Sequence, residues 1–323
     1  MGAAGIAVGP TPPYGPIWNV WRQGRVIPFL GAGASCAGRP SGAAWDPRGS
    51  AFLPTGSELS CLLAQETGYP ATELWERSDL AKVCSYYVDV SDRPNLRNRL
   101  RLILNRDYRP GPLHQLLAEI PVPQVIVVTN YDTLVEQAFD EAGKPYDLVV
   151  YPADSKEHAN SILWRPHADP EPRFESPKKL YIDLSKTTVI FKMHGSITRA
   201  TDKWDHFVIT EEDYVEFLSR MTTNSAVPAF FYQYFRERSF LFLGYGLRDW
   251  NLRLVLKNMS NHFASRNQAA ASGHDEPPKS WGIQRNPSDV ERALWDRRNV
   301  KIFDCDLDDF AAKLRETRSV MGG

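Results

Sequence analysis

The stretch that most constrains the fold is an uninterrupted apolar run near the middle of the chain, VIVV at residues 125–128. A run of β-branched residues without alternation is typical of a strand covered on both faces, as in a parallel α/β sheet. Polarity changes at Thr129-Asn130-Tyr131-Asp132, and the next residues, TLVEQAFDEAG, have helical spacing and end at Gly143. Ligands of open α/β sheets bind beyond the carboxyl ends of the strands, so Asn130 and Asp132 are predicted to lie at such an end.

Three further stretches repeat this order, an apolar run followed by glycine or polar residues. They are VIPFLGAGAS at 26–35, TVIFKMHGS at 188–196 and SFLFLGYGLRD at 239–249. If these runs and 125–128 are parallel strands of one sheet, their carboxyl ends converge on one cleft. Strand–helix repeats at 280–316 extend the pattern. The sequence therefore predicts an α/β fold with a doubly wound, mostly parallel, Rossmann-like sheet.

Composition is that of an ordinary soluble globular protein, with 42% hydrophobic and 24% charged residues and a formal net charge of -1. This balance gives no sign of direct nucleic-acid binding. No apolar run approaches the ~18 residues that a membrane helix needs, and the N-terminus lacks the pattern of a secretory signal. The cysteines form no CxxC pair, so we expect no metal site and reduced thiols in a cytoplasmic protein.

The order of segments predicts a flexible arm followed by one domain. Residues 1–16 are rich in Gly, Ala and Pro and are expected to form the arm, with docking on a neighbouring subunit as the alternative. Residues 17–323 are expected to form a single domain with a helical module at 56–118 and a long, irregular insertion at 144–187. The insertion is a candidate lid or assembly surface. Arginines at 97–109 are expected to form a solvated helix face, with a phosphate or partner site as the alternative.

The small residues after the first strand favour close approach to an anion. Gly31-Ala32-Gly33-Ala34-Ser35 allows the backbone to come near a ligand and to present N–H groups to it. The dinucleotide fingerprint GxGxxG is incomplete, because Cys36 occupies the third glycine position. No strand ending in an acid follows about 20 residues later, which disfavours an ordinary nicotinamide-dependent oxidoreductase.

The four motifs GAGAS, TNYD, HGS and GYGLRD, in this order, resemble the sirtuin-like fold over nearly the whole chain, from Val26 to about Glu316. FLGYGLRDWNLR and ITEEDYVEFL are similar to the bacterial subgroup of sirtuin-like, NAD-consuming effectors of antiphage defence. Two departures weigh against deacylation: the cysteine pairs of the zinc module are missing, and Gly244-Tyr245-Gly246 replaces a GTS-like motif. The resemblance implies that NAD is hydrolysed to ADP-ribose and nicotinamide without a metal, which would deplete NAD in an infected cell.

Residue types at the strand ends suit this chemistry, because cleavage of the nicotinamide–ribose bond develops positive charge on the ribose. Asn130 offers an uncharged hydrogen bond to a ribose hydroxyl or to the attacking water, and His194, with an ordinary pKa near ~6.5, offers a base. Gly31 and Gly33 can present N–H groups to the pyrophosphate. By resemblance, Asp132 contacts the nicotinamide carboxamide. The predicted catalytic residues are Asn130, His194 and Asp132. The predicted NAD-binding residues are Gly31, Ala32, Gly33, Ser35, Thr129, Gly244, Tyr245, Gly246 and Asp249.

Other interpretations remain open at this level. A histidine at a strand end is more often a satisfied structural residue, Asn130 could cap the following helix, and Asp132 or Asp249 could act only as a helix-start acid. An NAD-dependent protein deacylase and a non-catalytic NAD- or ADP-ribose-binding assembly module are the alternative functions. Because unregulated NAD depletion would be lethal, the resemblance implies gating by homo-oligomerisation or by a defence partner, such as a hexameric DNA-translocase-type ATPase or an Argonaute-type protein.

Overall fold

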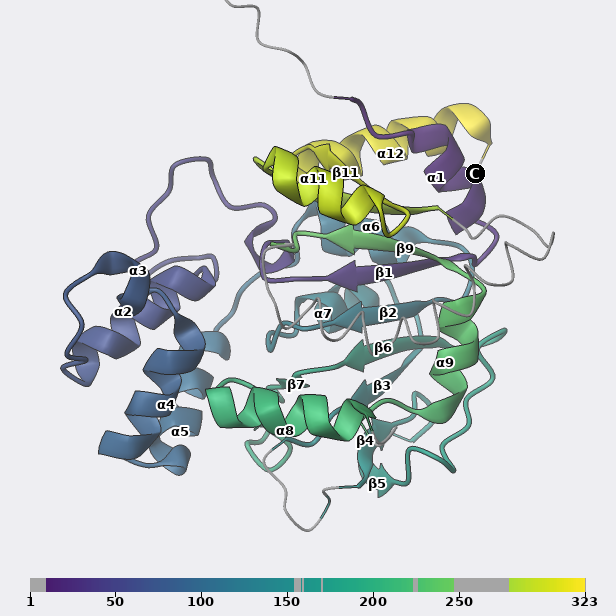
Figure 1. The fold of residues 1–323 in the computed structure, drawn as a ribbon. Coiled ribbons are helices and arrows are strands. Elements are labelled where there is room, and N and C mark those ends of the chain that lie inside the picture. Colours follow the sequence, from purple (N-terminus) through teal and green to yellow (C-terminus); the bar gives the residue numbers. More distant parts are fainter. Residues whose placement is uncertain are drawn as a thin grey trace, which may run out of the picture.

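The computed structural model describes residues 10–153, 158, 160–169, 171–222, 226–246 and 279–322. Its centre is a sheet with strand order β11-β10-β9-β1-β2-β6-β3-β4-β5 (Figure 1). Neighbouring strands from β11 to β3 are parallel, whereas β3–β4 and β4–β5 are antiparallel. The strands are β1 (Val26–Leu30), β2 (Val125–Val128), β3 (Tyr146–Val150), β4 (Ile162–Arg165), β5 (Arg173–Glu175), β6 (Thr188–Lys192), β9 (Ser239–Leu243), β10 (Ser280–Gln284) and β11 (Val300–Asp304).

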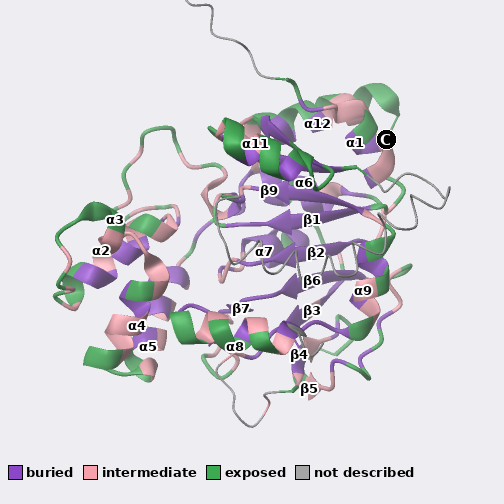
Figure 2. Cartoon of the chain, viewed as in Figure 1, coloured by how far each residue is buried: buried purple, intermediate pink, exposed green. Residues whose placement is uncertain are grey.

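The four apolar runs that precede the sequence motifs form the centre of this sheet. Strands β9, β1, β2 and β6 are direct parallel neighbours: Leu30 is paired with both Leu243 and Val128, and Val128 is paired in turn with the last residue of β6. All residues of these strands are buried, as their unbroken apolar character predicts (Figure 2). The prediction that the four strand ends share one edge of a parallel sheet is confirmed.

Helices cover both faces of the sheet, so the predicted doubly wound α/β class is confirmed. On one face α1, α6, α7 and α12 pack over a core that includes Ile126 and Ile190. On the other face α8, α9 and α11 pack over a core that includes Val127 and Phe191. These helices are α1 (Tyr14–Trp21), α6 (Pro112–Glu119), α7 (Leu134–Glu141), α8 (Glu211–Thr222), α9 (Ala229–Arg236), α11 (Asp289–Asp296) and α12 (Leu307–Met321).

A helical module stands beside the edge of the sheet toward which the parallel strands point (Figure 1). It contains α2 (Gly56–Glu66), α3 (Leu74–Arg77), α4 (Leu80–Val90) and α5 (Arg93–Leu104). Helices α2, α4 and α5 contribute to a third core, which also includes Phe207 and Ile209 from the segment after the HGS motif. The predicted module at 56–118 is too long, because α6 packs against α7 and α12 on the sheet. The leucines of α6, Leu113, Leu116 and Leu117, belong to the core of that sheet face.

Arginines of α5 connect the module to the segment that follows the HGS motif. Arg93 donates to the carboxylate of Asp213 at 2.8 Å and to the carbonyl of Phe207 at 2.7 Å. Arg101 donates to the carboxylate of Asp205 at 2.7 Å. Arg101 bonds to the buried side chain of Asp205, so the expectation of a solvated arginine face is wrong for this residue. Arg93 on the same helix has a similar bridging role, because it bonds to the carbonyl of the buried residue Phe207.

The predicted insertion at 144–187 is not wholly irregular. It contains β3, which is paired with β6 inside the main sheet, and the edge strands β4 and β5. The polar residue Asp147 interrupts the apolar pattern of β3 but is buried and satisfied. Its carboxylate accepts hydrogen bonds from the Trp164 indole at 2.9 Å and from the His167 backbone at 3.0 Å. These partners come from residues nearly 20 positions away, so the local pattern did not reveal the strand.

The first helix begins inside the predicted arm at 1–16. Helix α1 starts at Tyr14, whose ring packs against Phe310 of α12 with 5.6 Å between the ring centroids. The Tyr14 hydroxyl also lies 3.8 Å from the sulfur of Cys305. Contacts with the C-terminal helix therefore order this segment, while residues 1–9 lie outside the described part of the chain.

Candidate active site

The loops after β1 and β9 pack directly against each other. The N–H of Gly31 donates to the carbonyl of Leu243 at 3.0 Å, and the N–H of Gly33 donates to that of Gly244 at 2.8 Å. A Cβ on Gly33 would lie 2.8 Å from the Gly244 oxygen, and one on Gly31 would lie 2.5 Å from the Tyr245 ring. The glycines are thus required for loop contact. This differs from the expectation that these two N–H groups face a pyrophosphate, since both already have acceptors.

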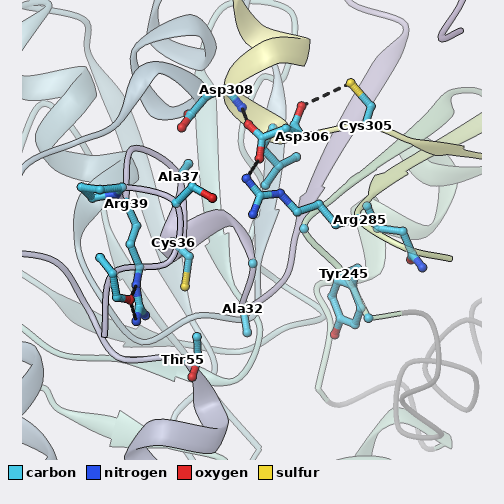
Figure 3. A pocket seen from close by; sticks show the side chains of 18 of the residues that line it. Ala32, Cys36, Ala37, Arg39, Thr55, Tyr245, Arg285, Cys305, Asp306 and Asp308 are labelled. Atoms are coloured by element: carbon cyan, nitrogen blue, oxygen red, sulfur yellow. Dashed lines mark hydrogen bonds and ion pairs between the residues drawn. The ribbon is translucent and has the colours of Figure 1, made fainter. Parts of the chain in front are cut away.

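A cavity of about 470 Å³ opens between these two loops and the ends of β10 and β11 (Figure 3). That volume lies within the range of small-molecule sites. Five of the predicted NAD-binding residues line it. They are Ala32, Gly33, Gly244, Tyr245 and Gly246. The cavity therefore brings together the first and last glycine motifs of the chain.

Charged side chains on the cavity wall are paired with one another. Arg39 forms two hydrogen bonds with Glu58, at 2.7 and 2.6 Å, which lower the pKa of that carboxyl to about 2. Arg285 forms an ion pair with Asp306 (Figure 3). Asp308 accepts a hydrogen bond from the Gly38 N–H at 2.7 Å, while burial raises the pKa of its carboxyl. The cavity thus offers hydrogen-bonding groups without a large excess of positive charge.

The far wall of the cavity comes from residues that the sequence predictions did not name. They lie at the ends of β10 and β11 or just beyond, and include Gln284, Arg285, Cys305, Asp306 and Asp308. The signal that could have found them was present, because both segments were predicted as strands of the same parallel sheet. The rule that places ligands beyond carboxyl ends applies to these strands as well.

Thr129 and Asn130 tie the end of β2 to the loop after β1. The Thr129 hydroxyl and N–H both donate to the carbonyl of Leu30, at 3.0 and 3.1 Å. The side-chain nitrogen of Asn130 donates to the carbonyl of Gly31 at 2.9 Å. Asn130 does not cap the next helix, which begins four residues later at Leu134. Its amide is instead held in one orientation next to the first glycine motif.

Asp132 is buried and has two hydrogen-bond donors. The Ser35 hydroxyl donates to one carboxylate oxygen at 2.5 Å, and the N–H of Leu134 donates to the other at 3.0 Å. The second contact is the helix-start role left open from the sequence. The first contact links GAGAS to TNYD through side chains. The contact with Ser35 was not predicted, since Ser35 and Asp132 are 97 residues apart.

His194 lies at the end of β6 in an aromatic environment. Its ring meets Tyr214 at 5.5 Å and Phe217 at 5.1 Å between centroids, both edge-on. The ring is only 4% exposed, and burial lowers its pKa to about 4, so the imidazole is neutral at pH 7. Its Nε2 atom has no hydrogen-bond partner among the described residues. A satisfied structural histidine would have one, so this environment favours a functional role.

The catalytic candidates occupy a different half of the edge from the cavity. Asn130 lies two positions beyond Val128 of β2, and His194 lies two positions beyond Lys192 of β6. Val128 and Lys192 are partners in the parallel pairing of these two strands. The N–H of Ile197 also donates to the carbonyl of Tyr131 at 2.9 Å, which connects the two turns. None of Asn130, Asp132 and His194 lines the described cavity, and Gly31, Ser35 and Thr129 also lie off its wall. Asp249 lies outside the described residues.

Two further observations apply to the described part of the chain. No group of three or more His, Cys, Asp or Glu side chains there is arranged to hold a metal ion. Within the same residues, no helix has the length and apolar character needed to cross a membrane.

Fold and motifs together define the class of this protein. The chain belongs to the SIR2-like domain family, which it matches over residues 124–303. It is similar to proteins named NAD(+) hydrolase ThsA, at 28% identity over 193 residues for the protein from Acinetobacter baumannii (58% of this chain, 33% of the relative). The protein of that name from Enterococcus faecium is 26% identical over 204 residues (59% of this chain, 34% of the relative). The alignments thus span about a third of the length of these curated relatives.

Proposed function

We propose that this protein hydrolyses NAD at the nicotinamide–ribose bond, giving ADP-ribose and nicotinamide. The observation that carries the proposal is the placement of His194. Its imidazole is buried and neutral, with Nε2 unpartnered among the described residues, at a strand end beside the one that carries Asn130. The similarity to proteins named as NAD(+) hydrolases supports this choice over other reactions.

The dinucleotide would lie along the carboxyl edge of the sheet. The cavity between β1, β9, β10 and β11 has the size and the hydrogen-bonding wall for its adenosine half. The nicotinamide riboside half would then extend toward Asn130 and His194 on β2 and β6. An extended ligand crossing several loops at one sheet edge is the usual arrangement for this kind of fold.

Each of these side chains has a separate role in the reaction. The oxygen of a water molecule forms a bond to C1′ of the ribose while the bond from C1′ to the pyridinium nitrogen breaks. The bonding electron pair returns to nitrogen, so nicotinamide leaves as a neutral base, and a proton of the water passes to Nε2 of His194. The fixed amide of Asn130 orients the ribose or the water, and Asp132 faces the carboxamide of the leaving group.

The biological consequence that we propose is depletion of cytoplasmic NAD as an antiphage response. Such an activity must be restrained in healthy cells, so we propose gating by self-association or by a partner protein. The protein named NAD(+) hydrolase ThsA from Acinetobacter baumannii is covered over only 33% of its length, so two thirds of that relative has no counterpart in the alignment.

The test is to incubate the purified protein with NAD over a series of protein concentrations and to quantify nicotinamide and ADP-ribose by chromatography. His194→Ala and Asn130→Ala are expected to abolish release of nicotinamide while leaving the fold intact by circular dichroism. His167→Ala is the matched control, because the side chain of this histidine is 45% exposed and is paired with Asp147 of β3, away from the two predicted catalytic turns. Cleavage that persists in both site variants would refute the residue assignment.

Binding distinguishes a restrained enzyme from a wrong proposal. NAD titrated calorimetrically should bind the parent protein even at concentrations where turnover is slow. Absence of both binding and cleavage at every protein concentration would overturn the proposed function. Turnover that requires an acylated peptide would point to a deacylase instead.

A further inference from the structure

Lys192 is a fully buried cation in the strand that carries the HGS motif. It is the last residue of β6 and lies two positions before His194. Its ammonium donates to the main-chain carbonyl of Asp132 and lies 3.4 Å from a carboxylate oxygen of Glu136 on α7. Burial of a charge is costly unless it is paired and hydrogen-bonded, so this lysine has a specific reason to be there.

The surroundings of Lys192 are otherwise those of an apolar core. Ile190, two residues earlier on the same strand, packs into the core formed with α6, α7 and α12. His114 on α6 and Glu136 on α7 both interact electrostatically with Lys192 and with Asp132 in the turn, and Arg165 also acts on Glu136. Burial raises the pKa of the Glu136 carboxyl and lowers that of His114 to about 4. A hydrophobic residue in place of a buried ion pair commonly gives equal or greater stability, so stability alone does not account for Lys192.

Geometry accounts for it better, because Lys192 completes the support of one turn. The carboxylate of Asp132 is held by Ser35 from the loop after β1 and by the N–H of Leu134. The carbonyl of the same residue is held by Lys192 from β6. Contacts from the loop after β1 and from β6 thus converge on a single residue of the turn that also contains Asn130.

We infer that Lys192 is a positioning residue for NAD cleavage: its ammonium fixes the carbonyl of Asp132 and thereby sets the turn with Asn130 against His194. This inference rests on the proposed function. Lys192 is fully buried, so it has no direct access to a substrate, and it interacts with His114 of α6 and Glu136 of α7. Glu136 serves to compensate its charge, so the contact with the carbonyl, and not the ion pair, sets the geometry.

The principal test is the double variant Lys192→Met/Glu136→Leu, which removes both charges and retains side chains of similar volume. We expect a melting temperature close to that of the parent and a kcat about 10- to 100-fold lower, with KM for NAD nearly unchanged. Ile190→Met is the matched control for altered packing on the same strand face, and it should retain kcat. A folded double variant with the parent kcat would overturn the inference.

Two further measurements keep the inference testable should the double variant fold poorly. Glu136→Gln preserves the contact between Lys192 and the carbonyl of Asp132, so it should retain activity. Loss of activity in this variant would show that the ion pair is what matters and would overturn the inference.

Hydrogen exchange needs no turnover. We expect faster exchange at 129–134 in Lys192→Gln and unchanged exchange in α12. Unchanged exchange at 129–134 would refute the positioning role. If the parent protein fails to cleave NAD, the proposed function is wrong. If the parent cleaves NAD and the Lys192 variants match it in kcat and in hydrogen exchange, only the positioning role of Lys192 is wrong.

Discussion

The hydroxyl of Ser35 donates a hydrogen bond of 2.5 Å to the carboxylate of Asp132. These residues belong to GAGAS and TNYD, the motifs that follow the neighbouring strands β1 and β2. Since Asp132 also accepts from the N–H of Leu134, its carboxylate has a fixed orientation. The two motifs are therefore one structural unit, and a substitution in either motif should alter the geometry of the other.

Ser35→Ala should impair NAD cleavage without unfolding the protein. A hydrogen bond to a charged group is worth about 1.5–3 kcal/mol, so kcat/KM should fall about 10- to 100-fold. Steady-state kinetics of nicotinamide release measures this change. Ser50→Ala is the control, because the Ser50 hydroxyl accepts an exposed hydrogen bond from the Asp46 N–H at 2.7 Å. Equal activity of both variants would contradict a role for the Ser35 contact.

Gly244→Ala and Gly246→Ala should behave very differently although they are two residues apart. Gly244 has a φ of +66°, and a Cβ there would lie 2.4 Å from the backbone nitrogen of Ala34. A Cβ on Gly246 would meet no atom of the described residues within 4 Å. We expect Gly244→Ala to lower the free energy of unfolding by more than about 2 kcal/mol and to abolish NAD binding, and Gly246→Ala to change stability by less than about 0.5 kcal/mol.

Urea unfolding and calorimetric titration with NAD measure these two effects. The comparison is well matched because both residues line the cavity. A similar small effect of both substitutions would mean that the contact between the β1 and β9 loops is not tight.

Arg101→Ala should destabilise the protein much more than Arg99→Ala on the same helix. Arg101 is paired at 2.7 Å with Asp205, whose side chain is 0% exposed, whereas Arg99 is paired with Glu66 and the two side chains are 28% and 31% exposed. Removal of one partner of a buried pair costs about 3–5 kcal/mol, and an exposed pair contributes at most about 1 kcal/mol. Equilibrium unfolding in urea measures both losses, and equal losses would contradict the difference in burial.

Stability should fall as the pH is lowered from about 6.5 toward 4. His114, His194 and His206 are buried, and burial is the main cause that lowers the pKa of each to about 4. Between an unfolded value near ~6.5 and this value, the unfolded chain binds more protons than the folded one, so the free energy of unfolding rises with pH. Each histidine contributes up to about 3 kcal/mol to this dependence.

Urea unfolding at several pH values measures that slope. His206→Leu should reduce it, because both ring nitrogens of His206 lack hydrogen-bond partners among the described residues and its ring is almost fully buried. An unchanged slope in this variant would show that burial of His206 is not a cause of the pH dependence.

Most of the parallel sheet could be predicted because its strands carry their own signal. VIPFL, VIVV, TVIFK and SFLFL each contain an apolar run of three to five residues, and both faces of each strand are buried. Strand β3 was missed, since Asp147 breaks its apolar pattern and is satisfied only by Trp164 and His167. Helix α6 was wrongly included in the helical module for a related reason. Its helical spacing was evident, but the local sequence does not show against which surface the helix packs.

The sequence by itself determined which residues stand at the strand ends, because strand length, burial and the change to polar residues are local properties. Only the tertiary structure decided what those residues touch. In the folded chain the N–H groups of Gly31 and Gly33 donate to the loop after β9, and the Ser35 hydroxyl donates to Asp132. Nε2 of His194 has no partner among the described residues. The tertiary structure also placed Lys192 beneath the turn. Such contacts join residues 60 or more positions apart, so they depend on how whole strands and helices pack and not on the residues next to each in the chain.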